Sequence, residues 1–116
     1  MEDAATFLYL ATTGHRTGRP HLIEIWFVEH EGRAYVVAEN RERAHWVQNV
    51  RSQPAVAFMI GRRLQRATAR EIDAAAEPEL HAKIRELMDR RYDWSDGLIV
   101  EIAPVGSPAR APSASA

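Results

Sequence analysis

Hydrophobic positions recur along this chain with two different periods, and the period predicts the type of each segment. Short apolar runs that are rich in β-branched and aromatic residues, and bounded by turn residues, predict β-strands. We expect strands over residues 7–13, 21–28, 34–38, 55–60, 64–72 and 98–102. The second run is apolar on both faces except at Glu24, which is typical of a strand buried on both sides. In the fifth run, Arg66 and Arg70 are expected to point outward.

Two further segments carry the 3.6-residue period of an amphipathic helix. A short helix is predicted to begin at Asn40, a good N-cap, and to stop before Pro54, with Trp46 on its apolar stripe. A longer helix is predicted from Pro78, which suits a first helical position, to Tyr92. The longer helix has the strongest periodic signal in the chain.

The order of these elements predicts the fold. Links of hairpin length between successive strands favour an antiparallel sheet. We therefore expect a mainly β, α+β fold, a six-stranded antiparallel barrel with a short helix after strand three and a longer helix before the last strand. The longer helix is expected to cap the open side of the barrel. This domain should span residues 1–103, whereas residues 104–116, which are almost entirely Ala, Pro, Ser and Gly, predict a disordered tail.

Composition narrows the classes of function. The chain has 116 residues, a net charge of −1 and no cysteine, which excludes thiol nucleophiles, disulfides and thiolate metal sites. Near-neutral charge argues against a dedicated nucleic-acid binder. The five histidines lack the spacing of a metal site, so we expect no metal. Without an apolar run long enough to span a membrane, or a secretory signal, we expect a cytoplasmic protein with no membrane contact.

Two polar clusters are candidates for anion binding. The first lies in the glycine-bounded loop 14–20, where Arg16 and Thr17 precede His21. Glycines let backbone N–H groups approach an anion, and these side chains donate charge-assisted hydrogen bonds to phosphate oxygens. The second holds Arg41, Arg43 and His45 at the predicted start of the short helix. The alternatives are a solvated hairpin turn and a polar first helical turn.

Three segments then resemble a known family. Residues 10–21, followed by 25–28, resemble the opening hairpin of the split β-barrel flavin and deazaflavin oxidoreductases. Residues 46–56 resemble that family's Asn-Leu-Arg-x-Asn-Pro-x-Val signature. Residues 79–98 are similar to its nitroreductase and quinone-reductase branch.

The resemblance implies a homodimer of split barrels related to pyridoxamine-phosphate oxidases. It implies that FMN or the deazaflavin coenzyme F-420 binds in a groove at the dimer interface. The residues implied to hold the cofactor phosphate or tail, or to flank the groove, are Arg16, Thr17, His21, Trp26, Asn40, Arg41, Arg43 and Trp46. This chain lacks the family's glycine-rich insertion between the third strand and the helix, and His21 replaces an arginine. Both cofactors therefore stay open.

The same resemblance implies hydride transfer from the cofactor to a small acceptor, namely an enone, quinone or nitro compound. Tyr92 is a candidate proton donor and Trp94 a candidate for lining the acceptor pocket. The alternative for both is that they close the core as aromatics at the helix end. Two other functions stay open: a non-catalytic split barrel that binds, stores or senses a flavin or haem, and an unrelated small barrel with a nucleic-acid or protein partner.

Overall fold

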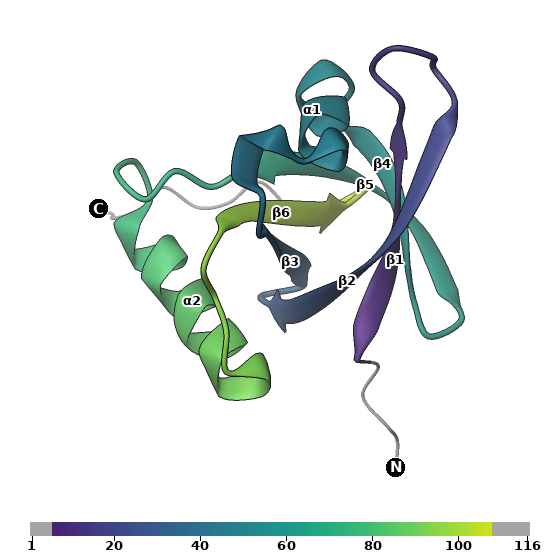
Figure 1. The fold of residues 1–116 in the computed structure, drawn as a ribbon. Helices are drawn as coiled ribbons and strands as arrows, with labels where there is room; N and C mark the ends of the chain where they lie inside the picture. Colours follow the sequence, from purple (N-terminus) through teal and green to yellow (C-terminus); the bar gives the residue numbers. More distant parts are fainter. Residues whose placement is uncertain (1–5, 108–116) are drawn as a thin grey trace.

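In the computed structural model, which describes residues 6–107, six antiparallel strands close into a barrel that carries two α-helices (Figure 1). The elements are β1 (Phe7–Thr13), β2 (Pro20–His30), β3 (Arg33–Ala38), a 3-10 turn (Arg41–Arg43), α1 (His45–Ser52), β4 (Ala55–Ile60), β5 (Arg63–Glu71), α2 (Pro78–Tyr92) and β6 (Leu98–Pro104). The strand order around the barrel is β1-β2-β3-β6-β5-β4. The predicted mainly β architecture and the positions of both helices in the chain are confirmed.

The barrel interior is filled by alternate side chains from all six strands, as the two-residue period of a strand requires. Leu8, Phe27 and Phe58 belong to this buried cluster, and so do Trp46 and Val47 of α1. The short helix therefore closes one end of the barrel. This corrects the expectation that the longer helix does so.

The longer helix α2 packs instead against the outside of the barrel, at the lower left of Figure 1. Its buried residues Ile84 and Met88 contact a second apolar cluster that contains Tyr35 and Val37 of β3 and Ile99 of β6. Both faces of β3 and β6 are therefore buried, one inside the barrel and the other beneath α2. Strands of this kind need a helix on their outer face.

β2 differs from its predicted burial. Its residues alternate between half-buried and exposed up to Trp26, and Leu22 is 66% exposed. The cause is its pairing: β1 lies beside β2 over most of its length, whereas β3 pairs with only its second half, from Phe27 to His30. In the described part of the chain, the first half of β2 is therefore an open edge of the barrel.

The start of the short helix also differs from the prediction. Asn40 does not cap an α-helix with its side chain; it precedes a 3-10 turn, and α1 begins only at His45. Arg41 takes a left-handed conformation with φ of +53°, and Ala44 is extended. The chain thus turns sharply between β3 and α1, which is how so short a link brings α1 over the barrel opening.

At the C-terminal end, β6 continues to Pro104, one residue beyond the predicted domain boundary. The backbone N–H of Val105 then donates to the carbonyl of Arg66 at 2.9 Å. The rest of the predicted tail, residues 108–116, lies outside the described residues.

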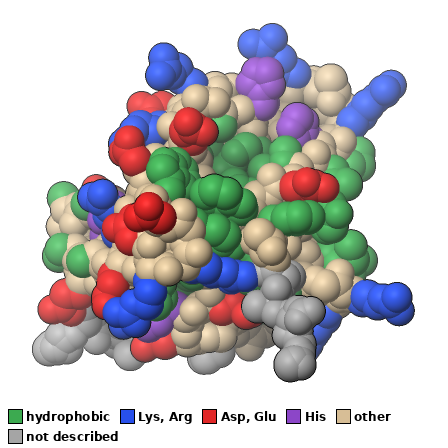
Figure 2. All heavy atoms as spheres, turned by 60° about the horizontal axis from the view of Figure 1, so that its bottom comes forward, with side chains coloured by type: hydrophobic (Ala, Val, Ile, Leu, Met, Phe, Trp, Pro, Cys, Tyr) green, Lys and Arg blue, Asp and Glu red, His purple; other side chains and the backbone are tan. Residues whose placement is uncertain are grey.

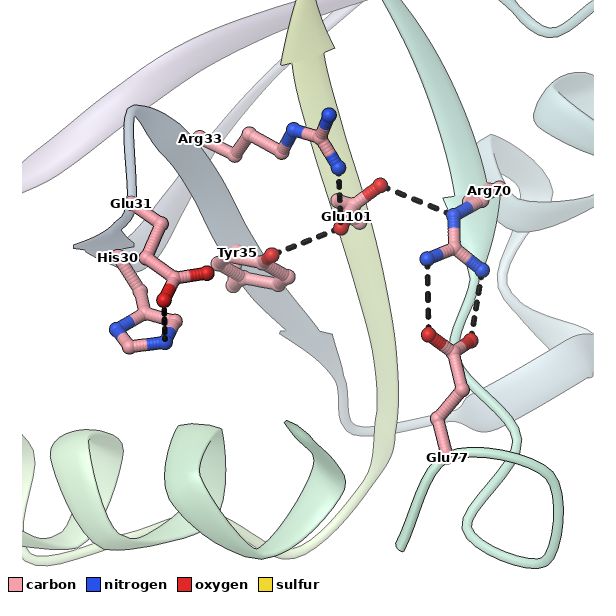
Figure 3. A network of polar contacts seen from close by, with 7 residues as sticks. All are labelled: His30, Glu31, Arg33, Tyr35, Arg70, Glu77 and Glu101. Atoms are coloured by element: carbon pink, nitrogen blue, oxygen red, sulfur yellow. Dashed lines mark hydrogen bonds and ion pairs between the residues drawn. The ribbon is translucent and has the colours of Figure 1, made fainter. Parts of the chain in front are cut away.

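A buried carboxylate joins three strands on the outside of the barrel (Figure 3). Glu101 of β6 is 2% exposed. Its Oε2 accepts a hydrogen bond from the Tyr35 hydroxyl at 2.7 Å and lies 3.5 Å from Nη1 of Arg33, both on β3. Its Oε1 accepts from Nε of Arg70, on β5, at 2.9 Å. One side chain therefore fixes β3 and β5 relative to β6.

The network also reaches the start of α2. Arg70 forms a two-point ion pair with Glu77, at 2.7 and 3.0 Å, and Glu77 directly precedes the helix. The hydrogen bond that Arg70 donates to Glu77 is the largest cause that raises the pKa of Arg70 above its ordinary value, and Glu101 adds to it. This chain of contacts holds the entry to α2 against the barrel.

We expect Glu101→Gln to lower the free energy of unfolding by about 2–3 kcal/mol, because it leaves guanidinium groups around a neutral buried amide. Tyr35→Phe, which removes one hydroxyl donor, should cost about 1 kcal/mol. Urea denaturation of both variants measures these losses. A loss for Glu101→Gln no larger than that for Tyr35→Phe would contradict the central position of the carboxylate.

Candidate functional site

A groove of about 900 Å³ runs along the open edge of β2. It lies between the first half of β2 and the segment that leads from the end of β3 into α1. Its aromatic lining consists of Phe7, Trp26, Trp46 and Trp94. Its polar lining consists of His21, Glu24, Glu39, Asn40, Arg43 and His45. A cleft of this size with a mostly apolar lining is typical of a cofactor or ligand site.

The edge of β2 also offers backbone groups to this groove. In antiparallel pairing, successive residues direct their N–H and C=O groups alternately to the two sides of a strand. Since Pro20–Trp26 pair with β1 on one side, every second residue of that stretch presents its donor and acceptor toward the groove. Such an edge can hydrogen-bond the rim of a planar heteroaromatic ring.

The lower part of Figure 1, where α2 ends and β1 begins, comes forward in Figure 2. Apolar side chains gather at the centre of this face, and acidic and basic side chains lie around them. The groove lining includes Phe7, which begins β1, and Trp94, which follows α2.

A smaller pocket of about 250 Å³ lies between the β1–β2 loop and α1. Its lining comprises Gly14, His15, Arg16, Thr17, His21, His45, Gln48 and Asn49. His21 and His45 also line the groove, so the two spaces are contiguous. We call the smaller one the anion pocket, because its lining combines a guanidinium, a hydroxyl, imidazoles and loop N–H groups.

Short backbone contacts fix the loop that forms one wall of the anion pocket. The N–H of Gly14 donates to the carbonyl of Arg19 at 2.7 Å, and the N–H of Gly18 donates to the carbonyl of Gly14 at 2.8 Å. A Cβ at Gly14 would lie 2.9 Å from Oγ1 of Thr17, so a side chain there would displace this pocket residue. Gly18 has φ of +74°, which favours glycine.

Asn49 of α1 holds the loop in place. Its side chain is 2% exposed, and its Nδ2 donates to Oγ1 of Thr12 on β1 at 2.9 Å. Its Oδ1 accepts from the backbone N–H of His15 at 2.8 Å and lies 2.7 Å from Nδ1 of the same residue. Because that oxygen is an acceptor, Nδ1 of His15 is the donor in this contact, and Nε2 is the ring nitrogen that remains for a ligand.

The structure brings most of the predicted site residues together. Arg16, Thr17 and His21 line the anion pocket. The groove is lined by His21 again and by Trp26, Asn40, Arg43, Trp46 and Trp94. Arg41 lies in neither lining set: its guanidinium donates to Asp96 at 2.8 Å, so its charge is used to join the 3-10 turn to the loop before β6.

Tyr92 is placed differently from the prediction, outside the groove lining. Its hydroxyl accepts from the N–H of Phe27 at 3.1 Å and lies 2.6 Å from the carbonyl oxygen of Thr6 and 2.9 Å from that of Phe27. Its ring stacks on Trp26 with 4.6 Å between centroids. A hydroxyl that is engaged with these backbone groups anchors the end of α2 to β2. The geometry therefore supports the alternative, an aromatic that closes the helix end, over a proton donor.

Sequence reasoning did not single out Asn49 or Phe7 as site residues. Asn49 was part of the signature-like segment, and an amide beside the apolar stripe of a short helix was the available signal. His45, by contrast, belongs to the basic cluster predicted at the start of the short helix. Phe7 opens the first strand and carried no signal beyond its apolar character.

The residues present fit a flavin or deazaflavin. An anionic tail needs cations and N–H groups, which the anion pocket provides, and a planar ring needs an aromatic-lined slot, which the groove provides next to it. Among residues 6–107, no group of three His, Cys, Asp or Glu side chains is arranged to hold a metal ion. In the same range, no helix has the length and apolar character needed to cross a bilayer.

Asn49→Ala should lower the free energy of unfolding by about 1–3 kcal/mol, because the Thr12 hydroxyl and the His15 N–H lose their partner in a buried site. Thr12→Val is the matched control, since it removes the contact to β1 and leaves both bonds to His15. We expect amide hydrogen exchange in loop 14–19 to accelerate in Asn49→Ala and much less in Thr12→Val. Equal exchange in the two variants would show that Asn49 does not hold this loop.

Comparisons with known proteins identify the family of this chain. The family model of the F420H(2)-dependent quinone reductase matches residues 2–98. Among solved structures, the chain is similar to HutZ, the heme storage protein from Vibrio cholerae, at 19% identity over 86% of this chain and 82% of that chain, with a TM-score of 0.70. It is similar to an F420-H2 dependent reductase, FDR-A, at 20% identity over 84% of this chain and 93% of that chain, with a TM-score of 0.68.

A third similar structure is provisionally described as a pyridoxamine 5'-phosphate oxidase from Listeria innocua, with 17% identity, 86% and 84% coverage of the two chains and a TM-score of 0.67. At these identities, similar structures show a shared fold alone. No curated protein matches the chain significantly.

The resemblance to split-barrel oxidoreductases is confirmed, together with the cofactor class, F-420 or FMN. Because the family model matches residues 2–98, which are most of the chain, the chain belongs to the F420H(2)-dependent quinone reductase family and is an oxidoreductase.

Proposed function

We propose that this protein binds F-420 or FMN across the anion pocket and the groove, and reduces a small conjugated acceptor, either a quinone, an enone or a nitro compound. The observation that carries this proposal is that the two spaces adjoin and share His21 and His45 as lining residues. A flavin-type cofactor has an anionic tail and a planar ring, and this site offers a cationic end and an aromatic end in the same order.

The chain's own residues supply binding and orientation. Arg16 and Thr17 would hold the anionic tail, and Arg43 and Asn40 would contact the part of the cofactor between tail and ring. Trp46, which is buried in the barrel cluster as well as lining the groove, gives the ring a rigid wall. When bound, the reduced cofactor supplies a hydride, which the acceptor takes up together with a proton. Holding both partners in one groove lowers the entropic part of the barrier.

The anion pocket predicts which variants lose the cofactor. Arg16→Ala and Arg43→Ala should each raise the dissociation constant of the bound cofactor about tenfold, the usual effect of losing one charge-assisted hydrogen bond. Titration with FMN and with F-420, followed by absorbance, measures this and ranks the two cofactors. Arg62→Ala, in the β4–β5 turn and away from both spaces, is the control of equal charge. Retention of neither cofactor at micromolar concentration would refute the proposal.

A second candidate function is storage or sensing of a flavin or haem without turnover. The similarity to a heme storage protein is the observation that supports this second candidate. The two proposals differ in one observable: a reductase that holds its reduced cofactor oxidises it when menadione is added, whereas a storage protein leaves it reduced. Haem retention in place of either flavin would favour storage directly.

We also infer that two copies of the chain associate through the outer face of β1, β2, β4 and β5. Leu22 is 66% exposed and Leu64 is 70% exposed. Both line an apolar groove of about 190 Å³ together with Tyr9 and Met59. Neighbouring apolar side chains that face outward on one sheet favour a protein partner, and the family resemblance implies that the partner is a second copy.

Leu64→Glu should raise the dimer dissociation constant at least about 100-fold. Two leucines are lost per interface, and each contributes about 1.5–3 kcal/mol when buried. Sedimentation velocity over a range of protein concentrations measures the change. Ala82→Glu adds the same charge to an exposed position of α2 and should leave association intact. A wild-type protein that is monomeric at all concentrations, or a Leu64→Glu variant that associates normally, would refute this interface.

A further inference from the structure

We propose that Trp26 is the stacking surface for the electron acceptor, and that Glu24 beside it selects acceptors that carry no negative charge. The inference rests on the proposed function, because it assumes that an acceptor enters this groove. It assigns Trp26 to the acceptor, in place of the cofactor-flanking role that the family resemblance implies.

The alternation of β2 separates two sides of the groove. Ile23 and Ile25 point inward and pack against the barrel cluster, and His21, on the same side of the strand, lines the anion pocket as well as the groove. Glu24 and Trp26 occupy the intervening positions and therefore point outward, yet both line the groove. The inward side is continuous with the anion pocket and suits the cofactor. The outward side is the part that the cofactor tail site does not reach.

The Trp26 indole is held flat before any ligand arrives. Tyr92 stacks against one face of it, with ring centroids 4.6 Å apart and an angle of 5° between the planes. Trp94 meets it edge-on at 6.2 Å and 73°. The indole is still 43% exposed. A planar aromatic that is fixed on one face and accessible elsewhere binds a second planar ring at little entropic cost.

Tyr92, on which the indole rests, is itself immobilised. Its hydroxyl is bonded to backbone groups of Phe27 and Thr6. The next residue on α2, Arg91, donates to the carbonyl of Phe27 at 3.0 Å, and its guanidinium lies 4.8 Å from the Phe27 ring centroid. The end of α2 thus positions Trp26 through Tyr92, which explains why Tyr92 is beside the groove without lining it. Tyr92 is a positioning residue in this arrangement.

Charge separates the two sides as well. The anion pocket and its continuation contain Arg16, Arg43 and the imidazoles. The outward side contains Glu24, an exposed carboxylate two residues from Trp26 on the same face of β2, and Glu39 lies on the opposite wall of the groove. The guanidinium of Arg91, 5.1 Å from the Tyr92 ring centroid, is engaged with the carbonyl of Phe27. The carboxylates therefore disfavour an anionic acceptor relative to an uncharged planar quinone.

The stacking surface is tested with menadione, an uncharged planar quinone, in the cofactor-loaded protein. Trp26→Ala should raise the KM for menadione about tenfold, and Trp26→Phe, which keeps a ring on Tyr92, about two- to threefold. Calorimetric titration of menadione into the protein with oxidised cofactor gives the same order of affinities without turnover. Unchanged affinity for menadione in both variants would overturn the assignment of Trp26. Circular dichroism establishes that each variant is folded.

The charge filter is tested by comparing menadione with a naphthoquinone sulfonate, which is anionic. Glu24→Gln should lower the ratio of the KM for the sulfonate to the KM for menadione about three- to fivefold at low salt. This change should shrink in 0.5 M NaCl, where the Debye length is only about 3–5 Å. Glu29→Gln removes the same charge from the same strand outside the groove, and should leave the ratio as in the wild type. A ratio that Glu24→Gln does not change at low salt would overturn the filter.

Failure of this inference is distinguishable from failure of the proposed function. A wild-type protein that binds neither cofactor refutes the proposed function. A protein that binds cofactor and reduces menadione, but whose Trp26 and Glu24 variants behave as the wild type, refutes this inference alone. If cofactor is held without turnover, the calorimetric titrations of menadione and of the sulfonate still decide both assignments.

Discussion

The buried amide of Asn49 joins the three parts of the chain on which the anion pocket depends. It connects α1 to β1 through Thr12 and to the β1–β2 loop through both the backbone and the ring of His15. A polar group so deeply buried is stable only when its hydrogen bonds are made. The amide therefore fixes the distance between the helix and the loop, and with it the space between Arg16 and His45. Glycines alone would leave that loop free to adopt many conformations.

The two halves of β2 belong to two different surfaces, because they differ in their strand pairing. Its second half completes the barrel with β3, while its first half extends beyond that pairing and leaves an edge open. The groove forms along this edge, and the outward residue Leu22 joins the apolar patch on the adjoining face. A barrel paired over its full length would have neither feature. Exposed apolar area is unfavourable in an isolated chain. Here that area forms the surfaces that are available for binding.

Much of the fold, but less of the site, was predictable from the sequence. Local period identified every strand and the helix over Pro78–Tyr92, since those signals arise within each segment. The predicted burial of β2 was wrong, because apolar side chains on both faces of a strand do not show which neighbour covers each face. The strands that are buried on both faces are β3 and β6. The predicted role of Asn40 was wrong because the left-handed Arg41 and the extended Ala44 interrupt the helical geometry, so that α1 begins only at His45. The hydrogen bonds of the Tyr92 hydroxyl join residues that are distant in sequence, and periodicity does not predict such contacts.

The arginines of this chain look equivalent in the composition, but the structure shows that some form ion pairs and others do not. Arg51 is paired to Glu71, whose hydrogen bond raises the pKa of that guanidinium, Arg70 is paired to Glu77 and Glu101, and Arg41 is paired to Asp96. In residues 6–107, by contrast, neither Arg16 nor Arg43 forms an ion pair with another described side chain; Arg16 lines the anion pocket and Arg43 lines the groove. A guanidinium whose field is not neutralised by a carboxylate attracts an anion most strongly. Pairing and position together therefore separate arginines that hold the fold from those that remain for a ligand, since Arg62 forms no ion pair with a described side chain either but lines neither space.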